Sequence, residues 1–405
     1  MITKPPPDVT TDAPGTASAP PPPPYTEAPK DGEAITWTAE PRHFVLGERR
    51  AHTSLAFPMA AEELFFVAKG EHSRGDFEIS LTGDRGPDIA VVDVDVMYHQ
   101  EHALDEVTVC HLRPEDGKEG LGIYTRHDWQ ATHHGFDSSL HFRIHLRFPA
   151  LAPGHTPFIV NQLTTDLPAF THHFRCLGSG MTFRRVKLES SICTIEGETL
   201  AGEEVTLIST NSQVRGNFTV SKLLDIKTSN APIIIRASLV NKESELTEMA
   251  IRTSNARIEA QVALESTGPD YSGGSFRVAA QTTNAPTLVV FKRHPVDAVL
   301  DAIIQTTNAP ARVTMHPAFE GRFELRSSPY LFPSIHELST VTDPAGRGRV
   351  RELERYDGKG DVHGRVWWKQ PQPEVPAAGT EDLATGPGAG RLSVETTNSP
   401  IDVSL

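Results

Sequence analysis

The chain has 405 residues, of which 38% are hydrophobic, 22% charged and 7% aromatic, and its formal net charge is −14. This length suits two or three domains, and the acidic balance argues against nucleic acid or an anionic membrane surface as the main partner. No apolar run is long enough for a transmembrane helix, and the first residues lack the apolar core of a signal peptide. Cys110, Cys176 and Cys193 match no zinc or redox spacing, so we expect reduced thiols in a cytoplasmic protein.

Residues 1–34 form a tail of Pro, Thr, Ala and Ser with almost no large apolar side chains. Such a segment cannot bury enough surface to fold, and we expect a disordered tail with polyproline II character. Within it, Pro22, Pro23, Pro24 and Tyr25 fit the Pro-Pro-x-Tyr ligand of WW domains, whose aromatic grooves bind preformed polyproline. The alternative is a chance match inside a run of prolines.

Residues 35–180 are expected to form a β-rich, sandwich-like region. A short helix is predicted over Pro58–Lys69, because Pro58 suits a first helical turn and Gly70 a stop. The alternation of apolar and polar residues in 90–96 and 141–148 predicts half-buried strands. Their inward residues are Val92, Val94 and Val96 in the first strand, and Phe142, Ile144, Leu146 and Phe148 in the second.

An internal repeat dominates residues 181–405. Two hydroxyl residues are followed by an asparagine in six copies, at Asn211, Asn230, Asn255, Asn284, Asn308 and Asn398. Four copies continue with Ala-Pro or Ser-Pro. Apolar residues recur four and six positions before most of these asparagines and three and five positions after them. Each unit therefore reads as a strand, a corner and a second strand, and the region is predicted to be a β-solenoid.

The residue types of the corner have structural reasons. Asn tolerates the left-handed backbone region at lower cost than most residues, which suits a tight corner. Stacked coils would also place the amides one above another, so that they bond along the axis as an asparagine ladder. Proline two residues later fixes φ at the start of the next strand, where a missing N–H is tolerated.

Ninety residues separate the last two asparagines. This gap contains a degenerate copy, Arg326-Ser327-Ser328-Pro329, and an excursion at about 330–390 with a predicted hairpin and a long Pro- and Gly-rich loop. The last coil, 401–405, ends without a polar cap. We expect either the excursion to cover this coil or an oligomer to form through it.

The repeat resembles the DUF4097-like "putative adhesin" β-solenoids of unknown function, and most closely a fungal, DUF7330-type branch that pairs such a domain with a Pro-rich tail. The matching residues are 224–233, 321–325, 343–349, 364–368 and 394–400. The chain departs from this pattern by using Asn-Ala or Asn-Ser where relatives often have Asn-Gly. The resemblance implies a fold and a label of adhesin by analogy, and it brings no catalytic or cofactor-binding residues.

Two sets of side chains suggest chemistry. Histidines occur as the pairs His133-His134 and His172-His173 and as the couple His141/His145. Alternation and rise along a strand separate them, so we expect solvent-facing histidines and no metal site. Asp93 and Asp95 share one strand face about 6.6 Å apart, a spacing used in glycoside hydrolysis.

The function expected from the sequence is therefore a non-enzymatic structural or protein-interaction role without a cofactor, with a rigid solenoid and a tail that binds a WW protein. An adhesin or glycan-binding module at the cell surface is the first alternative. A polysaccharide-active enzyme using Asp93 and Asp95 is the second, and it is disfavoured because no acidic cluster recurs inside the repeats.

Overall fold

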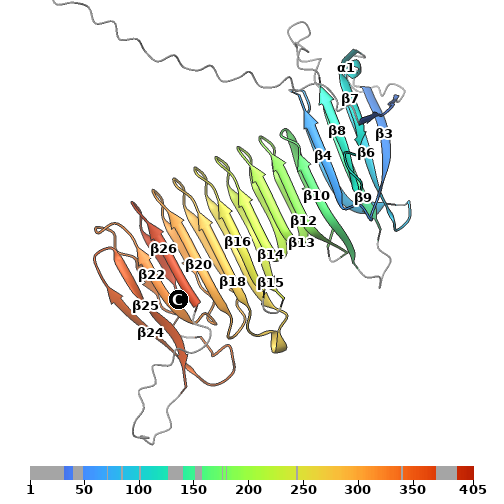
Figure 1. Cartoon of the computed structure of the whole chain (residues 1–405). Helices are drawn as coiled ribbons and strands as arrows, with labels where there is room; N and C mark the ends of the chain where they lie inside the picture. Colours follow the sequence, from blue (N-terminus) through green and yellow to red (C-terminus); the bar gives the residue numbers. More distant parts are fainter. Residues whose placement is uncertain are drawn as a thin grey trace, which may run out of the picture.

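The computed structural model describes residues 32–39, 49–370 and 390–405, apart from 71, 84, 100–101, 126–139, 151–156, 176, 179, 243–244 and 339–340. The described residues form 27 hydrogen-bonded strands and one short helix, α1 (His102–Asp105). The all-β, solenoid-like fold predicted from the repeat is therefore confirmed. Figure 1 shows the strands stacked side by side into a long rod.

The strands follow two ladders that face each other. The first ladder runs in the order β1 (Gly32–Ala34), β7 (Val107–Leu112), β8 (Lys118–Thr125), β4 (Glu63–Lys69), β10 (Phe158–Asp166), β12 (Met181–Ser190), the second halves of β13 (Ile195–Ser209) and β14 (Val214–Lys227), β16 (Leu246–Arg252), β18 (Ser275–Gln281), β20 (Val299–Thr306), β26 (Gly390–Thr396), β22 (Gly321–Arg326), β25 (Asp361–Lys369) and β24 (Val350–Asp357). Pairing is parallel from β8 to β22 and antiparallel at both ends.

The second ladder contains the strand that follows each corner. Its order is β2 (Thr38–Ala39), β3 (Arg49–Pro58), β6 (Ile89–Tyr98), β9 (His141–Pro149), β5 (Gly75–Gly83), β11 (Phe170–Phe174), the first halves of β13 and β14, β15 (Ile233–Asn241), β17 (Ile258–Ser266), β19 (Thr287–Arg293), β21 (Ala311–Thr314), β27 (Ile401–Ser404) and β23 (Ser334–His336). One hydrophobic core runs between the ladders from Ala51 to Leu405. The inward residues predicted around the asparagines line it, except the glycine at position 216.

The helix predicted over Pro58–Lys69 is wrong. Pro58 is the last residue of β3, and the segment continues into β4, in which Leu64, Phe66 and Ala68 are buried in the main core. Phe65 and Val67 point the other way, against a small second cluster of Cys110, Leu112 and Tyr124. A strand that is covered on both faces has a continuous apolar run, which periodicity alone does not distinguish from a helix.

The sandwich-like region and the solenoid share their sheets. The strands predicted at 90–96 and 141–148 are confirmed as parts of β6 and β9, and their inward Val, Ile, Leu and Phe residues are fully buried. Parallel stacking begins with β4 and β5 and passes through β10 and β11 into β12 and β13. The ladders thus cross the expected boundary at residues 180–181 without a break.

The last coil of the chain lies inside the stack. β26 pairs in parallel with β20 on one side and β22 on the other, and β27 pairs with β21 and β23. Gly321 faces Gly390 in this register, and a Cβ on Gly321 would lie 2.2 Å from the carbonyl oxygen of Gly390. Glycine is required here because the two backbones approach so closely.

The excursion covers the end of the rod. Its predicted hairpin is confirmed as β24 and β25, which extend the first ladder beyond β22. Because the terminal coil is paired along both edges, the expected oligomer contact through that coil has no free strand edge, and we correct that expectation. In Figure 1 the hairpin lies at the end of the rod opposite β3 and β6.

Candidate functional site: the asparagine corners and the pocket at the capped end

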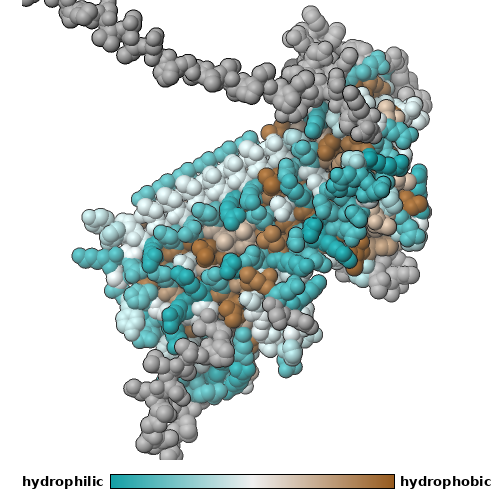
Figure 2. Space-filling model, viewed as in Figure 1, coloured by the Kyte–Doolittle hydropathy of each residue, from teal (hydrophilic) through white to brown (hydrophobic). Residues whose placement is uncertain are grey.

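The six repeat asparagines lie one above another along one edge of the rod. After the first, each asparagine donates from its Nδ2 to the Oδ1 of the preceding member of the series at 2.7–2.8 Å, through the pairs Asn230–Asn211, Asn255–Asn230, Asn284–Asn255, Asn308–Asn284 and Asn398–Asn308. These five bonds form a continuous asparagine ladder. The edge that carries the corners is pale to teal in Figure 2.

The backbone reinforces this ladder. The carbonyl oxygen of Ser229 accepts hydrogen bonds from the N–H groups of both Ser254 and Asn255 in the next coil. The same double acceptance recurs at Thr210, Ser254, Thr283 and Thr307. The first hydroxyl residue of each triplet is buried. The hydroxyls of Thr228, Thr253 and Thr306 donate to backbone carbonyls near the corners.

The expectation that Asn serves these corners through left-handed backbone is wrong. Among the described residues, the non-glycine residues with positive φ are Asp270, Tyr271 and Asp297, and no repeat asparagine is among them. The corner turns over several residues whose N–H and carbonyl groups bond to neighbouring coils, so no single residue has to take a strained conformation. Asn is therefore used for its amide, which bonds the coils above and below.

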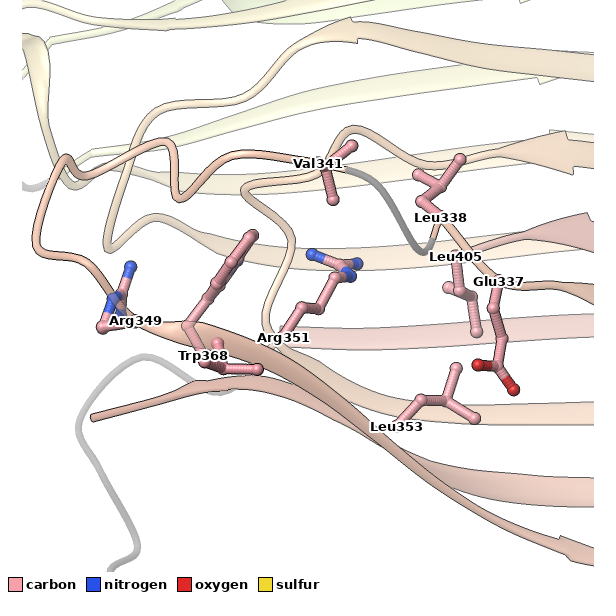
Figure 3. A pocket seen from close by; sticks show the side chains of 9 residues that line it. Glu337, Leu338, Val341, Arg349, Arg351, Leu353, Trp368 and Leu405 are labelled. Carbon is pink, nitrogen blue, oxygen red and sulfur yellow. The ribbon is translucent and has the colours of Figure 1, made fainter. Parts of the chain in front are cut away.

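A pocket of about 340 Å³ opens at the capped end of the rod. It lies between the inner face of the β24–β25 hairpin and the segment that follows β23. Its lining residues are Glu337, Leu338, Val341, Arg349, Val350, Arg351, Leu353, Trp368 and Leu405. Figure 3 shows Trp368 between the guanidinium groups of Arg349 and Arg351, with the aliphatic side chains on the remaining walls.

Arg349 is fixed by two carboxylates. It donates to Asp343 at 3.0 Å and to Glu320 at 2.9 Å, and it packs 5.8 Å from the centre of the Trp368 ring. The hydrogen bonds from Arg349, assisted by three backbone N–H groups, hold the pKa of Asp343 well below its usual range despite burial. This network shapes one wall of the pocket, and each guanidinium nitrogen of Arg349 donates to a carboxylate.

Arg351 is held differently. Its guanidinium lies 5.5 Å from the centre of the Trp368 ring, and its Nη1 donates to the carbonyl of Pro317, which also accepts from Trp368 Nε1 at 3.0 Å. Its Nη2 is buried and has no hydrogen-bond partner within the described part of the chain. Burial lowers the pKa of Arg351, and the neighbouring Glu320 opposes this effect.

The two predicted aspartates are each held in an ion pair. Asp93 accepts from Arg147 Nε at 2.6 Å, whereas Asp95 is bonded to Arg50 and, at 2.7 Å, to His52. Burial raises the pKa of Asp95, but the bonds from Arg50 and His52 outweigh it and lower that pKa. Each carboxylate thus neutralises a base on a neighbouring strand.

The expectation of solvent-facing histidines is wrong for two residues. His172 is fully buried between Thr165 Oγ1, at 2.8 Å, and the carbonyl of Phe170, and His294 is buried against Phe319. Burial lowers the pKa of both to about 4. Periodicity missed them because both lie at positions that a hydrophobic residue normally fills. His133 and His134 lie outside the described residues.

Pro22–Tyr25 lies outside the described residues, as does Cys176. Cys110 is buried and Cys193 half-buried; both are free, and burial raises their thiol pKa values. Over the described ranges there is no helix long and apolar enough to cross a membrane. Within the same ranges no three His, Cys, Asp or Glu residues are grouped as a metal site would require.

Comparison with known proteins gives little. No family model matches the chain, and no curated protein matches it. One solved structure, titled a "putative cell adhesion protein" from Clostridium sporogenes, is 7% identical over 87% of this chain and 99% of its own. Its TM-score is 0.18, and a similarity this low carries no argument about fold or function.

Proposed function

We propose that the protein is a non-enzymatic interaction protein, in which a rigid β-solenoid holds binding surfaces and a Pro-rich tail recruits a WW-domain partner. The observation that carries the proposal is the asparagine ladder. The most repeated motif of the chain is used to join coils, through five side-chain bonds and paired backbone bonds. A repeat devoted to stacking builds a stiff rod, and stiffness favours a role in positioning partners.

Two further features support this proposal. Asp93 and Asp95, the acidic pair that would suit hydrolysis, are each neutralised by bases on adjacent strands. The free thiols of Cys110 and Cys193 are consistent with the cytoplasmic location that we propose. We also propose that the chain belongs to the DUF7330-type, DUF4097-like solenoids, because the residues that carry the resemblance build the corners and the cap.

The recruitment part is tested by recovering WW-domain proteins with the intact chain and with a Tyr25→Ala variant. Tyr25 provides the aromatic residue that a Pro-Pro-x-Tyr groove requires, so its loss should abolish recovery. A variant with Pro5, Pro6 and Pro7 changed to Ala is the matched control, since it removes another proline run from the same tail. Equal recovery with the Tyr25→Ala variant would remove the WW site.

A second function, a glycan-binding adhesin, is favoured by the outer face of the β24–β25 hairpin. Tyr356, which is 57% exposed, stacks on His363, and Arg365 packs over the Trp367 ring at 5.3 Å. Exposed aromatic faces beside charged groups form a binding surface with both apolar and polar contacts. Polysaccharide binding that is lost in a Tyr356→Ala, Trp367→Ala variant would favour this function over the scaffold role.

A further inference from the structure

The pocket at the capped end combines aliphatic walls with a cation that has no anionic partner. Leu338, Val341, Leu353 and Leu405 supply apolar surface, and Arg351 supplies a guanidinium that makes no ion pair with a carboxylate of the described residues. A guanidinium that no carboxylate neutralises favours an anionic acceptor, because a charge-assisted hydrogen bond is stronger than one to a neutral group. Within the described part of the chain, Arg351 therefore lacks an anionic partner.

The nearby carboxylates do not fill this place. Glu320 and Asp343 both bond Arg349, and Glu320 additionally accepts from the backbone N–H of Trp368 at 3.3 Å. Glu337 lies on the exposed rim, and Figure 3 shows its carboxylate turned toward Leu353 and away from the Arg351 guanidinium. The two arginines of the pocket thus have different partners: Arg349 bonds two carboxylates, whereas Arg351 bonds a backbone carbonyl and packs against an aromatic ring.

We propose that this pocket binds a small carboxylic acid with an apolar chain, its carboxylate on Arg351 and its chain against Leu338, Val341, Leu353 and Leu405. A guanidinium is matched to a carboxylate by its planar fork of donors, and the bond is charge-assisted. The volume of about 340 Å³ lies within the range of small-molecule pockets. This binding activity is independent of the tail and of the WW partner.

Octanoate is the probe, titrated calorimetrically into the intact protein, with 1-octanol as the uncharged analogue of the same chain length. We expect saturable binding of octanoate at one site and binding of 1-octanol at least about tenfold weaker, since removal of a charge-assisted bond has about this effect. Arg351→Met should weaken octanoate binding at least about tenfold. Arg312→Met, the same change at an exposed arginine of β21 outside the pocket, should leave it unchanged.

Two results would overturn the assignment: octanoate that does not saturate, or octanoate that binds wild type and Arg351→Met equally. Circular dichroism establishes whether Arg351→Met is folded. If it is not, Val341→Trp serves in its place, because it keeps the charge and fills the space; undiminished octanoate binding by this variant would also overturn the proposal. Glu337→Gln should bind octanoate at least as tightly as wild type, since it removes a like charge from the rim.

Discussion

The Nδ2 of Asn398 donates to the Oδ1 of Asn308 at 2.8 Å, although 90 residues separate the two in the chain. This bond continues the asparagine ladder from the coil of β20 and β21 directly into the last coil of the chain. The coil that follows Asn308 in sequence, β22 and β23, lies one step further along the rod. The order of coils in the stack therefore differs from their order in the sequence.

The ladder should stabilise the rod in proportion to the number of bonds that each asparagine makes. Asn255 donates to Asn230 and accepts from Asn284, whereas the ladder gives Asn398 one bond, to Asn308. At about 1 kcal/mol per bond, Asn255→Ala should lower the free energy of unfolding by about 2 kcal/mol and Asn398→Ala by about half as much. Urea denaturation measures both changes, and Gln261→Ala, an exposed change outside the ladder, is the control. Equal effects of all three substitutions would contradict the ladder's role.

The stability of the capped end, where the β24–β25 hairpin covers the rod, should depend on Arg349 far more than on its neighbour Arg347. Side-chain exposure is 8% for Arg349 and 3% for its partner Asp343, so Arg349→Met leaves two carboxylates without their cation. Removing one partner of such a buried pair costs about 3–5 kcal/mol. Arg347 pairs with Asp297 at a half-exposed position, and Arg347→Met should cost less than about 1 kcal/mol. Thermal denaturation of the two variants gives the comparison, and a similar loss in both would argue against a buried cation at Arg349.

Acid should weaken the fold between about pH 6.5 and pH 4, before most carboxylates titrate. His172 and His294 have pKa values lowered to about 4 by burial, against about 6.5 in the unfolded chain. In this window the unfolded state binds up to two more protons than the folded state, so stability rises with pH and falls on acidification. Each histidine should contribute up to about 3 kcal/mol, and this contribution is fully present above pH 6.5 and lost by about pH 4.

The measurement is urea denaturation at intervals between pH 7 and pH 4. A His172→Gln, His294→Gln variant should show a much flatter dependence in this range. Asp95 and Asp343, whose pKa values are lowered, lose their stabilising charge below their ordinary titration range and so act outside the window. An unchanged slope in the double variant would mean that other groups control the acid response.

The repeat made the core predictable and left the order of the coils hidden. Apolar positions around each asparagine, such as Ile226, Ile251 and Ile304, show the inward residues because period-two alternation reports burial directly. The last coil, β26 and β27, is inserted between the coil of β20 and β21 and the coil of β22 and β23. The sequence hid this insertion because the coil of β22 and β23 carries no corner asparagine. Pro329 stands there at the position that the β22–β26 register matches to Asn398.

The candidate site was less predictable than the fold. Arg351 and Trp368 come together through the pairing of β24 with β25, and Arg351 also bonds Pro317, which is 34 residues away in sequence. No local pattern marks such a contact. His172 was missed for a different reason: it alternates with buried Phe170 and Phe174 at a position that a hydrophobic residue normally fills, and its partner hydroxyl comes from Thr165 on the preceding strand.

The most direct test of the account is a disulfide between adjacent corners. Neighbouring strands lie about 4.8 Å apart, within the Cα separation that a disulfide requires. In a background with Cys110, Cys176 and Cys193 changed to Ser, the pair Asn308→Cys, Asn398→Cys should form an intramolecular disulfide on mild oxidation, detected by peptide mass mapping. The pair Asn308→Cys, Pro329→Cys should not, because the last coil lies between these positions. A disulfide in the second pair and none in the first would show that the coils stack in sequence order. That result would contradict the insertion of the last coil beside Asn308 and the Asn308–Asn398 bond of the ladder.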